Sequence, residues 1–262
     1  MRPTVVALLL VCAGCGAKTD PHLAIAADLE AGVRALNRGV GLSSGLVASG
    51  VVNTAAPPDV IASSIYQRTQ TESGGCIKGT RNGAEIDLDF GTGCTLATAG
   101  MVLTGPVKAV VSTDPLGGDD ITLTLTGNSV DGQPISGNFK ILTTDGNLFS
   151  YAASLVLGDV QVNAPNLMAG IASGGATLDG NGTLTGPSAA GIAGGWQLTM
   201  VGLHEVFSGC YPDDGTAALA GGGQALTFSF DSSVPGSGQV SLAAGGTAAP
   251  IALPSRMGCP AK

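Results

Sequence analysis

The sequence predicts a mainly β protein: a large curved antiparallel meander sheet or barrel-like domain, with one N-terminal amphipathic helix. Three observations predict this fold class. Apolar and polar residues alternate strictly in several short runs after residue 76, which is the pattern of antiparallel strands that bury one face. Asp-Gly and Gly-rich pairs between these runs are typical of tight turns. One earlier stretch instead has apolar residues at helical spacing.

The predicted helix begins at Pro21, because Asp20 is a good N-cap and proline is favoured in the first helical turn. We expect it to run for about 18 residues and to end near Gly39 to Gly45, where glycine and serine accumulate. A second, short helix is expected over residues 60–66. Residues 21–75 therefore form an N-terminal helical segment. The apolar positions of the first helix are Leu29, Val33, Leu36 and Val40.

The strands are expected within residues 76–262, the predicted β-rich domain, where about a dozen of them fit the alternating pattern. Short turns between them favour a meandering sheet whose apolar face is partly covered by the helix. The clearest alternating runs are residues 85–90, 121–126 and 226–231. The predicted turns include Asp131-Gly132, Asp145-Gly146, Asp179-Gly180 and Gly236-Ser237-Gly238.

Short phrases recur within the β-rich domain. Leu103-Thr104-Gly105-Pro106 returns as Leu184-Thr185-Gly186-Pro187, and each half holds a cysteine pair around a strand that ends in phenylalanine. These features favour a duplicated β-unit. The alternative is chance recurrence, since the chain is rich in Leu, Thr and Gly.

The chain begins with the three parts of an export signal. Arg2 supplies the basic region, an apolar stretch runs from Val5 to Val11, and the small residues Ala13 and Gly14 follow. The stretch is shorter than the run of about 20 apolar residues that crosses a bilayer. Residues 1–14 are therefore predicted to be a cleaved signal peptide, and the protein to be exported.

The segment Cys12-Ala13-Gly14-Cys15 resembles the lipobox of bacterial lipoproteins. The resemblance implies cleavage before Cys15, which would carry a diacylglycerol and an amide-linked acyl chain such as palmitate, with residues 15–20 as a lipidated tether. Cys12 departs from the leucine that is most common there, and ordinary secretion with cleavage nearby is the alternative. Gly16 stands where the family's inner-membrane retention signal usually has Asp, which favours the outer membrane.

Four further cysteines, Cys76, Cys94, Cys210 and Cys259, remain in the predicted mature chain. An even number in an oxidising compartment predicts two disulfides, for which three pairings exist. Proximity in the sequence favours Cys76–Cys94 and Cys210–Cys259. Zinc is the rival explanation, but neither a CxxC motif nor a Cys/His cluster accompanies these cysteines. We expect no metal and no cofactor.

The charge and composition exclude some partners. The formal net charge is −8, and Lys and Arg together number only 11, so the chain is poorly suited to bind nucleic acid or anionic lipid headgroups. The expected contact with a membrane is through the lipid anchor. An envelope protein or an apolar ligand is the remaining kind of partner.

One strand carries a row of acids, Glu85, Asp87 and Asp89. Successive carboxylates on one strand face lie about 6.8 Å apart, which falls in the range of inverting glycosidases, and such acids can also hold calcium. The alternative is a solvated strand face whose like charges discourage edge pairing. We favour the solvated face, because glycosidase carboxylates come from different elements and flank the substrate.

Other motifs have ordinary structural explanations. Gly41-Leu42-Ser43-Ser44-Gly45 matches the GxSxG phrase of hydrolases but follows a helix, so we interpret it as a helix terminator. Asp179-Gly180-Asn181-Gly182-Thr183 is similar to the start of a calcium loop, and a plain β-turn is favoured. His204-Glu205 starts an HExxH pattern that Ser208 breaks. Trp196 is interpreted as a core residue, with a sugar platform shared with Tyr151 or Tyr211 as the alternative.

The residues from Asp89 to Thr95 read Asp-Phe-Gly-Thr-Gly-Cys-Thr and resemble a phrase found in uncharacterised β-rich envelope lipoproteins, which brings no known activity with it. Together these observations predict a lipid-anchored envelope protein, most simply a non-enzymatic structural or binding module. The two alternatives are a carrier of lipid or a small apolar ligand, and a hydrolase that uses the acidic strand 85–89.

Overall fold

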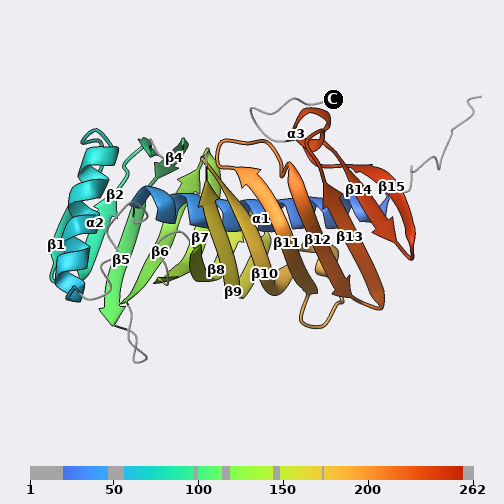
Figure 1. The fold of residues 1–262 in the computed structure, drawn as a ribbon, viewed down its shortest axis with the longest axis horizontal. Helices are drawn as coiled ribbons and strands as arrows, with labels where there is room; N and C mark the ends of the chain where they lie inside the picture. Colours follow the sequence, from blue (N-terminus) through green and yellow to red (C-terminus); the bar gives the residue numbers. More distant parts are fainter. Residues whose placement is uncertain are drawn as a thin grey trace, which may run out of the picture.

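The computed structural model describes residues 20–46, 56–96, 100–113, 119–143, 148–172 and 174–255. Within these ranges the chain forms one antiparallel sheet, accompanied by two long helices (Figure 1). The helical elements are α1 (Pro21–Leu46), α2 (Pro58–Glu72), the 3₁₀ turn η1 (Pro187–Ala189) and α3 (Val234–Ser237). The strands are β1 (Lys78–Asn82), β2 (Glu85–Asp89), β3 (Cys94–Leu96), β4 (Met101–Thr104), β5 (Pro106–Thr113), β6 (Asp119–Val130), β7 (Gln133–Thr143), β8 (Leu148–Leu157), β9 (Val160–Ala172), β10 (Gly175–Thr185), β11 (Trp196–Val206), β12 (Asp214–Gly221), β13 (Gln224–Phe230), β14 (Gln239–Ala244) and β15 (Thr247–Ala252).

The sheet is a meander, as predicted, and it is not closed into a barrel. Neighbouring strands follow the order β1-β2-β5-β6-β7-β8-β9-β10-β11-β12-β13-β14-β15. The hairpin of β3 and β4 lies off this path and joins it through pairing of β4 with β6. No pairing links β1 to β15 in the described part of the chain, so the barrel-like alternative is wrong.

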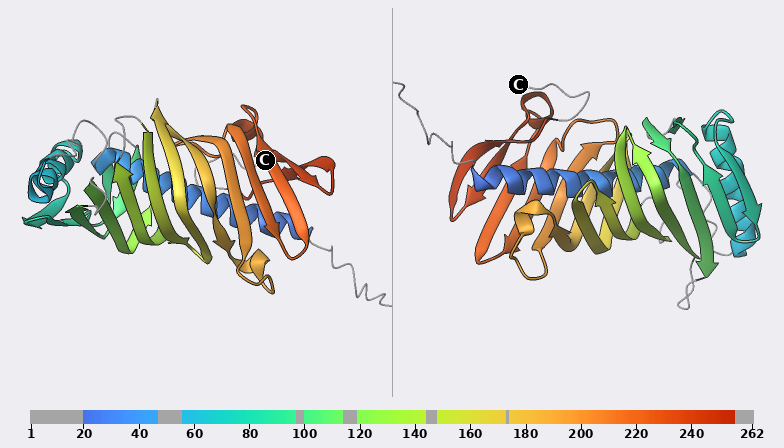
Figure 2. Two further views of the ribbon diagram at one scale, coloured as in Figure 1. Left: turned by 60° about the horizontal axis from the view of Figure 1, so that its bottom comes forward. Right: turned by 180° about the vertical axis from the view of Figure 1, so that it is seen from behind.

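Helix α1 runs along one face of the sheet and crosses its strands (Figure 2). Its N-terminal end lies beside β13 to β15, and α2 packs on β1, β2 and β5 at the other end of the molecule (Figure 1). The helix is buried on all sides, since every residue from Gly32 to Leu46 is buried. The sequence predicted an amphipathic helix that covers part of a face, and the structure instead places α1 inside the sheet's curve.

The core forms on both sides of α1. The sheet presents Phe139, Leu155 and Leu184 to one side of the helix. Pro212, Phe230 and Leu253 face Leu29 and Val33 on another side. The two sets together leave no solvated stripe along the middle of the helix, so α1 is the central element of the hydrophobic core.

The predicted length of about 18 residues was too short, because α1 has 26 residues and includes all of Gly39 to Gly45 before it ends at Leu46. Glycine lowers helix propensity, but here it allows close packing. A Cβ atom on Gly39 would lie 2.5 Å from Cδ2 of Phe139, and one on Gly32 would lie 2.4 Å from Cδ1 of Leu184. Each of these glycines is a notch in the helix surface, that is, a position where the missing side chain makes room for a core side chain. This close packing outweighs the low helix propensity of glycine.

Substitution of one notch glycine tests this packing. Gly39→Ala should gain about 1 kcal/mol in helix propensity and lose about 3 kcal/mol by overpacking, the upper part of the usual range. The high cost is expected because the buried Phe139 ring also packs on Tyr151, with centroids 4.9 Å apart. We expect a net loss of about 2 kcal/mol in urea unfolding.

The matched control is Gly45→Ala in the same helix. A Cβ atom there would lie 3.5 Å from Leu96, which is an ordinary contact, so stability should stay equal or rise by up to about 1 kcal/mol. Equal changes in stability for Gly39→Ala and Gly45→Ala would contradict the close packing inferred at Gly39.

The local predictions of strands and turns have different outcomes. The alternation in β2 is confirmed, because Ile86 and Leu88 are buried while Glu85, Asp87 and Asp89 are exposed. The turn predicted at Asp179-Gly180 is wrong, since both residues lie within β10, which is irregular in its pairing there. Asp131-Gly132 does form the turn between β6 and β7, and Asp145-Gly146 lies outside the described residues.

The recurring Leu-Thr-Gly-Pro phrases take different structures. The first joins β4 to β5, whereas the second joins the end of β10 to η1. Their local structures therefore do not support a duplication.

Candidate functional site

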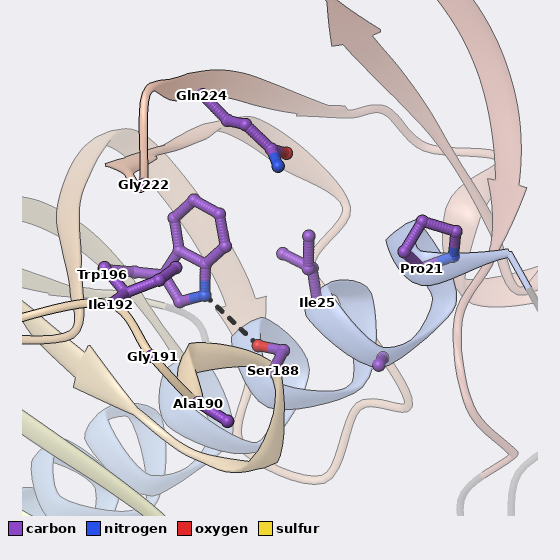
Figure 3. Close-up of a pocket in the computed structure, with 10 residues that line it drawn as sticks. Pro21, Ile25, Ser188, Ala190, Gly191, Ile192, Trp196, Gly222 and Gln224 are labelled. Carbon is purple, nitrogen blue, oxygen red and sulfur yellow. Dashed lines mark hydrogen bonds between the residues drawn. The ribbon is translucent and has the colours of Figure 1, made fainter.

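A pocket of about 430 Å³ lies at the N-terminal end of α1 (Figure 3). We call it the α1-end pocket. It is lined by residues from four places in the fold: the first turns of α1, η1 and the loop after it, the start of β11, and the turn between β12 and β13. The lining residues are Pro21, Ala24, Ile25, Ser188, Ala190, Gly191, Ile192, Trp196, Gly222 and Gln224.

A hydrogen-bonded chain holds the walls of the α1-end pocket together. The backbone N–H of Ser188 donates to Oδ2 of Asp28 on α1, at 2.7 Å. The indole N–H of Trp196 donates to Oγ of Ser188, at 3.2 Å (Figure 3). Asp28 and Trp196 are both buried. This chain fixes α1 against η1 and β11, so the pocket is a preformed feature of the fold.

The chemistry of the α1-end pocket is that of a contact surface. None of its ten lining residues is charged, and its polar side chains are the hydroxyl of Ser188 and the amide of Gln224. Such a lining suits an uncharged or amphiphilic surface. It offers no acid or base for catalysis.

A second pocket, of about 420 Å³, lies beside a buried ion pair on α1. Nε of Arg34 donates to Oε1 of Glu30 at 2.9 Å, and its NH2 group also pairs with that atom. Nη1 of Arg34 donates to Oε1 of Gln133 on β7, at 2.5 Å. One turn further along, Arg38 pairs with Asp131 at 2.8 Å. These contacts fasten α1 to the β6–β7 turn.

Asn37 is a buried polar residue of α1 whose role the sequence did not reveal. Its side chain is 0% exposed, and neither of its amide atoms has a hydrogen-bond partner among the described residues. Burying such a group costs about 1–3 kcal/mol. Asn37→Leu, which keeps the shape, should therefore raise the free energy of unfolding by about 1–3 kcal/mol, measured by urea unfolding. A loss of stability would show that the amide is bonded.

A third cavity between α1 and the C-terminal part of the chain is nearly filled. It measures about 10 Å³, which is enough for one water at most. Its lining residues are Leu29, Glu30, Val33, Pro212, Phe230 and Leu253.

The acidic strand is a solvated face with cationic neighbours. Nζ of Lys108 lies 2.8 Å from Oε2 of Glu85, and the hydrogen bond and charge of Glu85 raise the pKa of Lys108. Asp87 lies opposite Lys108 on β5, and Asp89 lies opposite Lys78 on β1. In the described ranges, no group of three or more His, Cys, Asp or Glu side chains could hold a metal ion. The exposed acids of this strand therefore have lysines as their cross-strand neighbours.

The GxSxG phrase lies entirely within α1, so it does not form a strand-to-helix turn. The hydroxyls of Ser43 and Ser44 donate to the carbonyls of Val40 and Gly41, at 2.7 and 2.9 Å. Tyr151 contacts Ser43 from β8, and burial raises the pKa of Tyr151 to about 12. These hydroxyls have structural bonds and no base beside them.

The remaining predicted polar residues are separate from the pocket at the end of α1. His204 lies on β11, and its Nδ1 is 2.5 Å from Oδ1 of Asp213. Asp179 accepts a hydrogen bond from the N–H of Gly202 at 2.7 Å. Both are local structural contacts.

The disulfide between Cys76 and Cys94 is present, with Cα atoms 5.9 Å apart. Cys210 is also disulfide-bonded, and its predicted partner Cys259 lies outside the described residues. The second pairing stays a prediction. The predicted lipidation residue Cys15 likewise lies outside the described residues.

The core position predicted for Trp196 is confirmed, but the sequence did not predict its pocket. Asp28, Glu30 and Arg34 were also missed. The one available signal was the spacing of Glu30, Arg34 and Arg38, which follow one another at intervals of four residues.

Comparison of the chain with protein-family models, with curated proteins and with solved structures finds no match. Among the described residues, no helix combines the length and apolar character needed to cross a membrane.

Proposed function

We propose that this chain is an exported lipoprotein of the bacterial cell envelope, anchored through Cys15, and that its β-domain is a non-enzymatic structural or binding module. The export signal and the lipobox-like segment in residues 1–15 support the anchor. Gly16 favours the outer membrane. Two or more acyl chains on one cysteine would make the anchoring stable.

The observation that carries the proposal for the domain is the enclosure of α1. A carrier of this architecture would need an apolar cavity between helix and sheet. Beside Leu29 and Val33 the helix itself occupies that space and leaves a cavity of only about 10 Å³. The two larger pockets lie at the first turns of α1 and beside the charged Glu30–Arg34 pair. We therefore favour a solid module over a carrier.

The acidic strand supports the same choice over a hydrolase. A hydrolase needs a carboxylate across a cleft from its partner, whereas Glu85 pairs with Lys108 on the next strand. A binding role would then use the outer surfaces of the module.

Lipidation is tested by intact-mass analysis of protein extracted from membranes. The mature protein should begin at Cys15 and carry added acyl mass, and Cys15→Ala should release it into the soluble fraction because the anchor is lost. Cys12→Ala is the matched control and should remain anchored. An unmodified mature form that begins elsewhere would refute the anchor. If Cys12→Ala released the protein and Cys15→Ala did not, the anchored residue would be Cys12.

A further inference from the structure

We infer that the end of the domain that carries the α1-end pocket faces the membrane, with the pocket against the lipid headgroup layer. This inference rests on the proposed anchor at Cys15. It adds an orientation: α1 begins near the bilayer, and the end that carries α2 lies away from it.

The length of chain between anchor and domain is the first support. Cys15 precedes Pro21 by six residues, and a fully extended chain of that length spans about 20 Å. Pro21 is itself a lining residue of the α1-end pocket. The pocket therefore cannot lie far from a membrane that holds Cys15.

The surface chemistry of this end is the second support. The pocket lining is uncharged, and Leu23 beside it is 39% exposed. Two carboxylates lie at this end: the buried Asp28 accepts the backbone N–H of Ser188, and the exposed Asp20 accepts that of His22 at 2.9 Å. An uncharged lining with apolar side chains beside it suits the interfacial layer of a bilayer.

The opposite end has a different character. Figures 1 and 2 show α2, β1 and β2 at the far end of the molecule from the start of α1. The 26 residues of α1 span about 39 Å at the helical rise. The far end carries the charged row of Glu85, Asp87 and Lys108 on exposed strand positions. Charged side chains favour water over the membrane interface, so this end is expected to point into the aqueous space.

The only tryptophan of the chain lies in the pocket and serves as the probe. Lipidated protein is placed in phosphatidylcholine vesicles with dansyl-labelled headgroups, and energy transfer from Trp196 is measured. The matched variant Trp196→Phe/Val60→Trp moves the donor to α2, where Val60 is 48% exposed. Because transfer falls steeply with distance, we expect it to be several-fold higher from the wild type. Equal transfer, or more from the variant, would overturn the orientation.

A second measurement leaves the fold unchanged. Hydrogen exchange of wild-type protein on vesicles is compared with that of soluble Cys15→Ala protein. Residues 187–195 and 221–224 should exchange more slowly on the vesicles, while α2 should not change. Protection of α2 instead would reverse the orientation, and no protection at either end would refute the contact. Missing acyl mass would overturn both the anchor and this inference, whereas acyl mass without the expected transfer or protection would overturn the orientation alone.

Discussion

Replacement of Glu30 by leucine is expected to lower the free energy of unfolding by about 3–5 kcal/mol, the usual loss when one partner of a buried ion pair is removed. The side chains of Arg34 and Glu30 are only 11% and 5% exposed. Without the carboxylate, the guanidinium keeps its bond to Gln133 but is left as a buried charge. Urea unfolding with the slope held constant measures the loss.

The double variant Glu30→Leu/Arg34→Leu is the control. Removal of both charges leaves neither member of the pair without its partner, so the stability of the double variant should return to within about 1 kcal/mol of the wild type or exceed it. A double variant as unstable as Glu30→Leu would mean that the hydrogen bond from Arg34 to Gln133 is what holds α1 to β7. A neutral single variant would contradict the burial of the pair.

The second large effect is expected in β2. Leu88→Ala should lower the free energy of unfolding by about 2–5 kcal/mol, as truncation of a buried leucine usually does, because Leu88 is only 2% exposed. Asp87→Asn on the opposite face should change it by no more than about 0.5 kcal/mol, since Asp87 is exposed. Thermal melts of the two variants compare the faces of one strand.

Thermal melts with and without calcium test whether the acidic face of β2 is a metal-binding site. The melting temperature of the wild type should not depend on calcium. A rise with calcium that Asp87→Asn abolishes, or a large loss of stability in Asp87→Asn alone, would contradict the solvated face.

The local pattern predicted the β-strands well because each strand's two faces have different surroundings. Ile86 and Leu88 face the core while Glu85 and Asp87 face water. Apolar and polar residues therefore alternate in the sequence with a period of two. The Asp131-Gly132 turn was predictable for a similar reason, since both residues adopt positive φ, at 50° and 78°, which few residue types tolerate.

The same reasoning could not find the full length of α1 or its surroundings. Gly39 and Gly41 are unfavourable in an isolated helix. A glycine fits there because side chains from far along the chain pack against it: Phe139 at Gly39, and Met101 and Phe207 at Gly41. The α1-end pocket was hidden for the same reason, because Pro21, Ser188 and Gln224 are distant in the sequence.

The sequence by itself determined the mainly β class, the strand faces and the helical start at Pro21, since each depends on residue type at short spacing. The anchor at Cys15 stays a prediction. Only the tertiary structure decided that the sheet stays open, that α1 is enclosed and that its charges are buried. Glu30, Arg34 and Asn37 are polar residues that local pattern assigns to water. They are buried because the β6–β7 turn and the C-terminal strands fold against the helix, and no short-range signal encodes which segments meet there.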